Sequence, residues 1–308
     1  MEPLAAKQIT TLDPRQIRLM SVAGYASVGV ALTLIALKTW AWFATGSIAL
    51  LSSLADSLLD LLASGVTLFA VKVAVSPADR EHRFGHGKSE GIAGVVQAVI
   101  ITGSAGYVCV QAVDRLITPS PVESPAVGFF VMLVSLVLTI ALVLLQRYVV
   151  THTGSLAIAA DAAHYRSDVL TTLAVLLAIF LSTQFGLHIL DPLLALVVVA
   201  LILWSVYTII LAALNVLLDR ELEDIDRKRI AEIARAHPEV RGLHDMRTRS
   251  SGAAQFIQFH LELDPKMSLT RAHEICDAVE EKVQQSFPAA EVLIHADPHG
   301  LPENRDPF

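Results

Sequence analysis

The chain has 308 residues, of which 54% are hydrophobic and only 17% are charged, and its formal net charge is −7. Soluble domains carry about 25% charged residues, so this composition favours a membrane protein. The acidic balance, with Lys and Arg not gathered into a stripe, argues against a nucleic-acid partner. Cys109 lies in an apolar stretch and Cys276 in the polar C-terminal part, so no structural disulfide is expected.

Six apolar segments follow one another along the chain, and each is long enough for the roughly 20 residues that a membrane helix needs. They cover residues 17–43, 48–75, 90–117, 126–150, 155–183 and 187–218. Lys and Arg occur before the first segment and between the second and third, whereas the stretch after Thr183 has neither. Because basic loops stay on the cytoplasmic side, we expect both termini in the cytoplasm.

The polar C-terminal part has the pattern of a small α+β domain. A helix is predicted over 223–237, two strands over 240–249 and 254–264, a second helix from Ser268 to about Phe287, and a last short strand at 292–294. A domain of this size buries only a modest core, so pairing with a second copy is expected. The predicted organisation is an N-terminal cytosolic segment 1–16, a six-helix transmembrane domain 17–219, a cytosolic metal-binding and dimerisation domain 220–300, and a tail 301–308.

Two pairs of ionisable residues interrupt the apolar segments. Asp56 and Asp60 lie in the second segment, and His164 and Asp168 lie in the fifth. Each pair has i, i+4 spacing, which places both side chains on one helix face. A carboxylate at the bilayer centre costs at least about 2.5 to 3.5 kcal/mol on insertion scales, and such residues usually mark an ion pathway. We therefore predict one four-ligand transport pocket, with a buried polar network that only stabilises helix packing as the alternative.

Two further charges in the apolar segments receive simpler interpretations. Asp161 lies one turn before His164, and we interpret it as a solvated charge at a helix end, with a cytosolic entrance ligand as the alternative. Lys38 lies near the outer end of the first segment and is expected to extend its ammonium to the membrane interface.

Two more groups of residues have side chains that ligate metals. One is Asp79, His82 and His86, in the loop between the second and third segments. The other lies in the C-terminal part and contains His244, His260, His273, His295 and Asp297. Imidazole and carboxylate ligands suit zinc. The alternatives are a solvated loop and ordinary surface histidines.

Five short strings carry a resemblance to a known family. They are Ser57-Leu58-Leu59-Asp60 after Asp56, Phe84-Gly85-His86-Gly87-Lys88, His164-Tyr165-Arg166-Ser167-Asp168, Leu218-Asp219-Arg220, and His244-Asp245-Met246-Arg247-Thr248-Arg249. In this order and spacing they resemble the cation diffusion facilitator family, closest to its bacterial zinc and iron efflux branch. The resemblance runs from the first apolar segment to Asp297.

The resemblance implies a fold, an activity and sites. The fold is a polytopic α-helical membrane protein with six transmembrane helices and a C-terminal cytosolic α+β metallochaperone-like domain, in the cell inner membrane. The activity is efflux of a divalent metal, Zn²⁺ or else Fe²⁺ or Cd²⁺, in exchange for protons, by a homodimer in the lipid bilayer that uses no nucleotide. The transport, loop and cytosolic sites are the three groups above, and Lys88 and Asp219 match a charge interlock of the family.

Functions of other classes are less well supported. An ATP-driven pump or a membrane enzyme would need a phosphate-binding or nucleophile motif, and neither G-x-x-x-x-G-K-[ST] nor G-x-S-x-G is present. A divalent-metal channel, or a membrane metal sensor that does not transport, would use the same ligands and remains the alternative.

Overall fold

The structure is a computed structural model that describes residues 13–46, 48–117, 126–185, 190–252 and 254–300. These residues form two compact units. The helical unit comprises Pro14–Val75 and Ser89–Leu214. Of the described residues, the C-terminal unit comprises Asp13, Ser76–Lys88 and the chain from Asn215 onward. The loop between the second and third long helices therefore belongs to the C-terminal unit.

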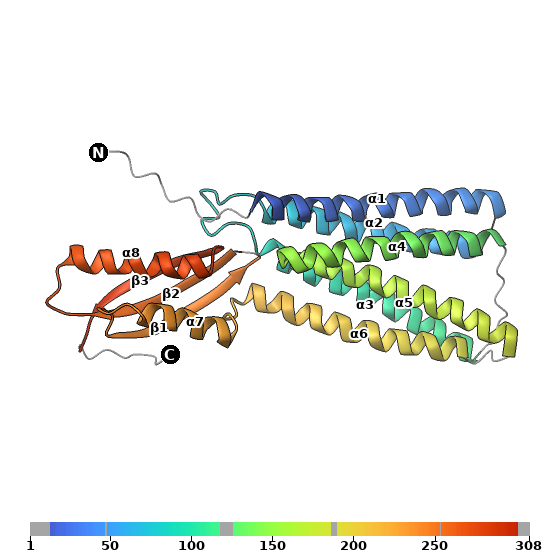
Figure 1. The fold of residues 1–308 in the computed structure, drawn as a ribbon. Helices are drawn as coiled ribbons and strands as arrows, with labels where there is room; N and C mark the ends of the chain where they lie inside the picture. Colours follow the sequence, from blue (N-terminus) through green and yellow to red (C-terminus); the bar gives the residue numbers. More distant parts are fainter. Residues whose placement is uncertain (1–12, 47, 118–125, 186–189, 253, 301–308) are drawn as a thin grey trace. The chain divides into compact units, whose positions relative to one another are not determined.

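Six long helices form at the six predicted apolar segments, as Figure 1 shows. They are α1 (Pro14–Thr45), α2 (Ile48–Ala74), α3 (Ser89–Ile117), α4 (Ala126–Thr153), α5 (Leu156–Phe185) and α6 (Leu190–Leu217). Among the described residues, five helices are long and apolar enough to cross a membrane. The remaining one is α5, which carries Asp161, His164, Arg166 and Asp168.

Small residues mediate the close packing of α1 in the helical unit. Ala23, Ser27 and Ala31 follow one another at i, i+4 spacing and are each 0% exposed. This stripe of small side chains allows α1 to pack against both α2 and α4. A Cβ added at Gly24 would lie 2.9 Å from Leu68 Cδ1, so a larger residue there would require the Leu68 side chain to move.

The C-terminal unit contains the predicted order of helices and strands. They are α7 (Asp224–Arg235), β1 (Gly242–Ser251), β2 (Ala254–Leu263), α8 (Leu269–Ser286) and β3 (Ala290–Pro298). Ser268 caps α8, because its hydroxyl accepts a hydrogen bond from the Arg271 backbone N–H at 3.2 Å. The last strand is longer than the predicted 292–294.

The three strands form one sheet in the order β1-β2-β3. β1 pairs with β2 antiparallel, and β2 pairs with β3 parallel through the α8 crossover. Both helices pack with the sheet in one apolar core, which includes Ile230 of α7, Ile275 of α8 and Phe259 of β2. This confirms the predicted α+β layer.

Candidate metal sites

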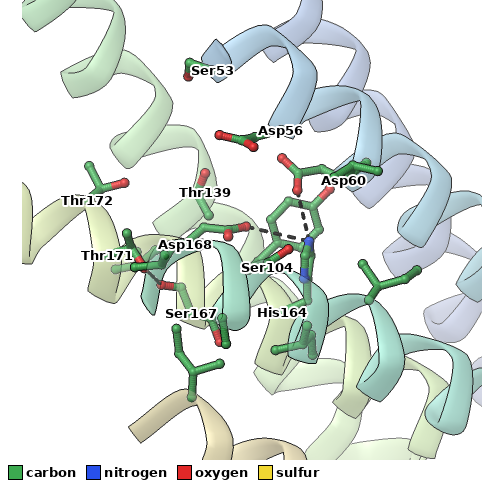
Figure 2. A pocket seen from close by; sticks show the side chains of 18 of the residues that line it. Ser53, Asp56, Asp60, Ser104, Thr139, His164, Ser167, Asp168, Thr171 and Thr172 are labelled. Atoms are coloured by element: carbon green, nitrogen blue, oxygen red, sulfur yellow. Dashed lines mark hydrogen bonds and ion pairs between the residues drawn. The ribbon is translucent and has the colours of Figure 1, made fainter. Parts of the chain in front are cut away.

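The helical unit contains a cavity of about 710 Å³. Its walls come from all six long helices, and Figure 2 shows polar side chains around it. The four predicted transport ligands, Asp56, Asp60, His164 and Asp168, all line it. The structure therefore brings the α2 pair and the α5 pair to one cavity.

Three of these side chains lie within reach of a single ion. His164 Nε2 is 2.9 Å from Asp60 Oδ1 and 3.9 Å from Asp168 Oδ2, and Figure 2 shows both interactions. One ligand atom from each of the three residues lies within 4.8 Å of the others. Ligands about 2.1 Å from a tetrahedral zinc are roughly 3.4 Å apart, so small side-chain movements would complete such a site.

Asp56 completes the predicted set less directly. It borders the same cavity one helical turn before Asp60. It does not belong to the group of three whose ligand atoms lie within 4.8 Å of one another. Its role as the fourth ligand stays a prediction.

The chemistry of the three grouped residues fits a cation. His164 is buried, with a side chain that is 3% exposed, and Asp60 is 14% exposed. Asp168 Oδ2 is buried and has no hydrogen-bond partner among the described residues. A buried carboxylate oxygen without a donor is costly unless an ion or a proton occupies it.

The interpretation of Asp161 as a solvated helix-end charge is wrong. The residue is 0% exposed. Its Oδ2 accepts hydrogen bonds from Ser27 Oγ at 2.6 Å and Gln146 Nε2 at 2.7 Å. Its Oδ1 accepts one from Gln97 Nε2 at 3.3 Å. Asp161 thus connects α5 to α1, α4 and α3, and the sequence alone did not show that these partners converge.

The interpretation of Lys38 is also wrong. Its Nζ does not extend to an interface but donates to the Ser53 carbonyl oxygen at 3.0 Å and to Ser57 Oγ at 2.7 Å. Both acceptors belong to α2, and Lys38 lines the same cavity as the four predicted ligands. The nearby polar groups of α2 satisfy the ammonium inside the unit.

The predicted loop site is assembled in the C-terminal unit. Asp79 Oδ1 lies 3.5 Å from His82 Nδ1, and Asp79 Oδ2 lies 3.3 Å from His86 Nε2. Ser76 Oγ lies 3.2 Å from the other ring nitrogen of His86, which leaves Nε2 directed at the carboxylate. The ligand atoms of the three predicted residues form one group.

Backbone hydrogen bonds hold the Asp79 carboxylate in place. Its Oδ1 accepts from the N–H groups of His82 at 2.6 Å and Glu81 at 2.9 Å. The bond from the His82 N–H is the main reason that the pKa of Asp79 lies below its ordinary value. The site therefore presents an ionised ligand at neutral pH.

Aromatic and glycine contacts fix this loop to the sheet of the C-terminal unit. The Arg249 guanidinium lies 4.7 Å from the ring centroid of Phe84 and 4.8 Å from that of Phe256. Gly87 packs against Ser251 so closely that an added Cβ would lie 2.1 Å from the Ser251 carbonyl oxygen. Only glycine fits there, so the loop that carries the site packs directly against the sheet.

A charge cluster lies at the C-terminal end of the same loop. Lys88 Nζ is 3.0 Å from Asp219 Oδ2, and Arg249 Nη1 is 3.3 Å from Asp219 Oδ1. Partial burial raises the pKa of Asp219, but the hydrogen bonds and charges of Lys88 and Arg249 outweigh it and hold this pKa below its ordinary value.

The sheet of the C-terminal unit places three predicted ligands side by side. His260 pairs in register with His244 on one neighbouring strand and with His295 on the other. Asp297 lies between their rings. Its Oδ2 is 2.7 Å from His260 Nδ1 and 3.3 Å from His244 Nε2, and its Oδ1 is 3.1 Å from His295 Nε2. One carboxylate thus contacts three imidazoles.

The donor set at this cluster fits a bound metal. Both ring nitrogens of His244 are buried and make no hydrogen bond within the described residues, although Nδ1 lies at ion-pair distance, 3.2 Å, from Glu262 Oε1. His260, His295 and Asp297 form one group of potential ligands, and His244, Asp245 and His260 form another. A cluster of imidazole nitrogens and carboxylate oxygens, in which His244 and Asp297 are buried, suits zinc.

The fifth predicted residue, His273, lies elsewhere in the unit. It is exposed on α8, with Nε2 3.6 Å from Asp277 Oδ2. It is not in the ligand groups found among the described residues. Its role stays a prediction.

Sequence analysis missed two acidic residues of this cluster. Asp245 would face away from His244 in a regular strand, but a bulge follows His244 and Asp245 has φ of 48°, which brings its carboxylate to the same group. Glu262 lies two residues after His260 on β2, so strand alternation could have identified it.

Comparisons with known proteins identify the family of the chain. The profile of the cation efflux transmembrane domain matches residues 25–218, and that of the cation efflux protein cytoplasmic domain matches residues 222–299. The chain belongs to the cation efflux family. It is therefore a multi-pass membrane transporter of cations, and the predicted membership of the cation diffusion facilitators is confirmed.

Individual relatives cover almost the whole chain. The cation-efflux pump FieF of Pectobacterium atrosepticum is 42% identical over 295 residues, 96% of this chain and 98% of that protein. FieF of Shewanella oneidensis is 45% identical over 279 residues, 91% of this chain and 94% of that protein. Among solved structures, MamM-CTD is 30% identical with a TM-score of 0.24, over 25% of this chain and 98% of that one.

Proposed function

We propose that this transporter exports a divalent metal ion, with zinc as the preferred ion, from the cytoplasm in exchange for protons. The observation that carries the proposal is the convergence of Asp60, His164 and Asp168 in one cavity. A site of carboxylates with one imidazole suits zinc, whereas magnesium and calcium sites generally use oxygen ligands alone. Fe²⁺ and Cd²⁺ are the next candidates.

Competition at the ligands supplies the coupling. Carboxylate and imidazole must lose their protons to hold a metal, so metal and protons exclude one another in the same cavity. If the cavity opens to the two sides of the membrane in turn, protons entering from outside displace the metal outward. The FieF relatives are named cation-efflux pumps, which fits this direction.

The arrangement in the cell follows from the same proposal. The protein would be a homodimer in the inner membrane, with both termini in the cytoplasm, because Lys and Arg concentrate in the loops expected on that side. The C-terminal match is to a cytoplasmic domain, which supports this orientation.

Two further metal sites would serve other purposes in this scheme. The loop site of Asp79, His82 and His86 and the sheet cluster around Asp297 lie in the C-terminal unit, outside the transport cavity. We assign the sheet cluster a resident zinc that stabilises this unit and its dimer. The exposed His273 would be accessible to a second copy.

Flux in proteoliposomes tests the function. The wild-type protein should move zinc saturably and faster when protons flow the opposite way, and calorimetry in buffers of different ionisation enthalpy should show proton release on binding. Asp60→Ala and Asp168→Ala should abolish flux while the protein elutes as a folded dimer. Glu281→Ala, at an exposed position of α8, is the control and should keep wild-type flux.

Three results would contradict the proposal. Wild-type flux in a folded Asp168→Ala protein would show that this cavity is not the transport site. Flux that rises linearly with zinc and ignores the proton gradient would indicate a channel. Zinc binding without flux would indicate a sensor.

A further inference from the structure

Lys38 is a positively charged residue in the wall of a cavity that should attract positive ions. It lies on α1 and is half-buried. Its Nζ donates to the Ser53 carbonyl oxygen at 3.0 Å and to Ser57 Oγ at 2.7 Å. Ser57 is 0% exposed, so this anchor is inside the protein. An ammonium in the membrane interior is costly and usually has a functional role.

The anchor keeps the ammonium beside the ligands and not among them. Ser53 and Ser57 lie one turn apart on α2 and bracket Asp56, and Figure 2 shows Ser53 on the side of Asp56 away from Asp60. Lys38 shares the cavity with Asp56, Asp60 and Asp168. Because two oxygen atoms of α2 hold the ammonium, a metal ion bound by the carboxylates would not need to displace it.

The position of Lys38 affects the net charge of the cavity. Three carboxylates line the cavity together with the imidazole of His164 and the ammonium of Lys38. With one divalent ion bound, the three negative charges equal the two charges of the ion and the one of Lys38. We propose that Lys38 is a fixed counter-ion of the transport cavity, which makes the cavity electrically neutral when it holds one divalent cation.

This role goes beyond the proposed transport function and rests on it. Without the ammonium, the metal-loaded cavity would keep one net negative charge beside the ion. The ion would then be held more tightly, because Coulomb interactions are strong in such a site. Release of the metal ion would become slower. By weakening metal binding, Lys38 would therefore speed the release step of each transport cycle. Lys38 is a positioning and charge-balancing residue and does not contact the metal.

The variants Lys38→Gln, Lys38→Met and Lys38→Arg test this role in the full-length protein. To isolate the cavity, each variant also carries His86→Ala and His260→Ala, which disable the other two metal sites. Lys38→Gln and Lys38→Met should bind zinc at least about tenfold more tightly than the parent, with a lower KM and a lower maximal flux. Lys38→Arg keeps the charge and should restore both values to within about threefold.

A lysine elsewhere in the helical unit provides the control. Lys72 lies on α2 with its Nζ 4.9 Å from the centroid of the Tyr25 ring, and it does not line the cavity. Lys72→Gln removes a charge of the same kind, and zinc affinity at the cavity should stay within about twofold of the parent.

The outcomes separate this inference from the transport function. Unchanged or weaker zinc affinity in folded Lys38→Gln and Lys38→Met, while Asp60→Ala abolishes binding, would overturn the role of Lys38 alone. If Asp60→Ala binds zinc as the parent does, the transport site itself is wrong. If both neutral variants fail to fold, Lys38→Arg decides the question, because it keeps the charge. A Lys38→Arg protein whose zinc affinity differs from that of the parent by about tenfold in either direction would overturn the role.

Discussion

Carboxylates with buried oxygen atoms in the helical unit are of two kinds, distinguished by their donors. Asp161 accepts hydrogen bonds from three side chains. Asp168 has a buried oxygen with no donor among the described residues and lies at the cavity. A carboxylate whose oxygens are satisfied by fixed donors has a structural role, whereas an unsatisfied one is available for a cation. Spacing in the sequence does not distinguish the two kinds, because both sit on one face of α5.

Asp219 provides a prediction about pH at the scale of one residue. Its pKa is held below the ordinary aspartate value of about 3.9, so its contribution to stability is complete above that value and is lost as the pH falls through the lower folded-state pKa. Asp219→Asn should destabilise the protein at pH 6 to 8 by less than about 1 kcal/mol, because the pair is half-exposed. The difference should shrink below about pH 4.

Thermal melting of the detergent-purified protein at several pH values measures this difference. Glu281→Gln, which neutralises an exposed carboxylate on α8, is the control. A difference between wild type and Asp219→Asn that grows as the medium becomes acidic would contradict the assigned sign.

At the scale of the element, the start of α5 is determined by a residue of another helix. Glu90 of α3 is 1% exposed. Its Oε2 accepts hydrogen bonds from Ser155 Oγ at 2.9 Å and from the backbone N–H groups of Leu156 at 2.6 Å and Ala157 at 3.3 Å. The carboxylate therefore satisfies the free N–H groups at this helix terminus and interacts favourably with its dipole. It also fixes the N-terminal end of the helix that carries His164.

Removal of this cap should destabilise the helical unit. Glu90→Ala should lower the free energy of unfolding by about 1 to 3 kcal/mol, because buried donors lose their acceptor. Glu90→Gln should cost less, since its carbonyl oxygen still accepts. Melting temperatures in detergent give the order of the three proteins, with Glu281→Ala as the exposed control. Equal melting temperatures for wild type and Glu90→Ala would show that the cap contributes nothing.

The sequence predicts elements and local pairs well, but not long-range polar partners. Apolar length located all six helices, and i, i+4 spacing placed the two members of each ionisable pair on one helix face. The contact between Asp60 and His164 comes from the packing of α2 against α5. The interpretation of Lys38 failed because the sequence of one helix does not distinguish an ammonium that reaches the membrane interface from one that donates hydrogen bonds to a neighbouring helix. The partners Ser53 and Ser57 belong to another helix, and only packing of α1 on α2 identifies them.

At the scale of the molecule, the chain divides its polar chemistry between two units. The transport cavity lies in the helical unit, and the loop site and the sheet cluster lie in the C-terminal unit. The match to two family domains follows the same division. A metal ion bound in the C-terminal unit would therefore have a role separate from that of the transported ion. A small domain gains more than a large one from a bound metal, because its own core stabilises it only weakly.

The sheet cluster should therefore stabilise the C-terminal unit and its dimer when zinc is present. A metal that binds only the folded form raises stability in proportion to the logarithm of its concentration. Replacing His260 and Asp297 together by Ala removes the residues that link β2 to β3 through the cluster. The double variant should lose most of the zinc-dependent rise in melting temperature, as measured by calorimetry of the full chain. Its dimer should dissociate at a higher protein concentration than the wild-type dimer, as measured by analytical ultracentrifugation. The cavity should still bind zinc, because its ligands are untouched. His237→Ala, another histidine of this unit outside the ligand groups, should behave as wild type. A double variant that melts and dimerises as wild type does, both with zinc and with chelator, would show that these side chains are ordinary surface residues.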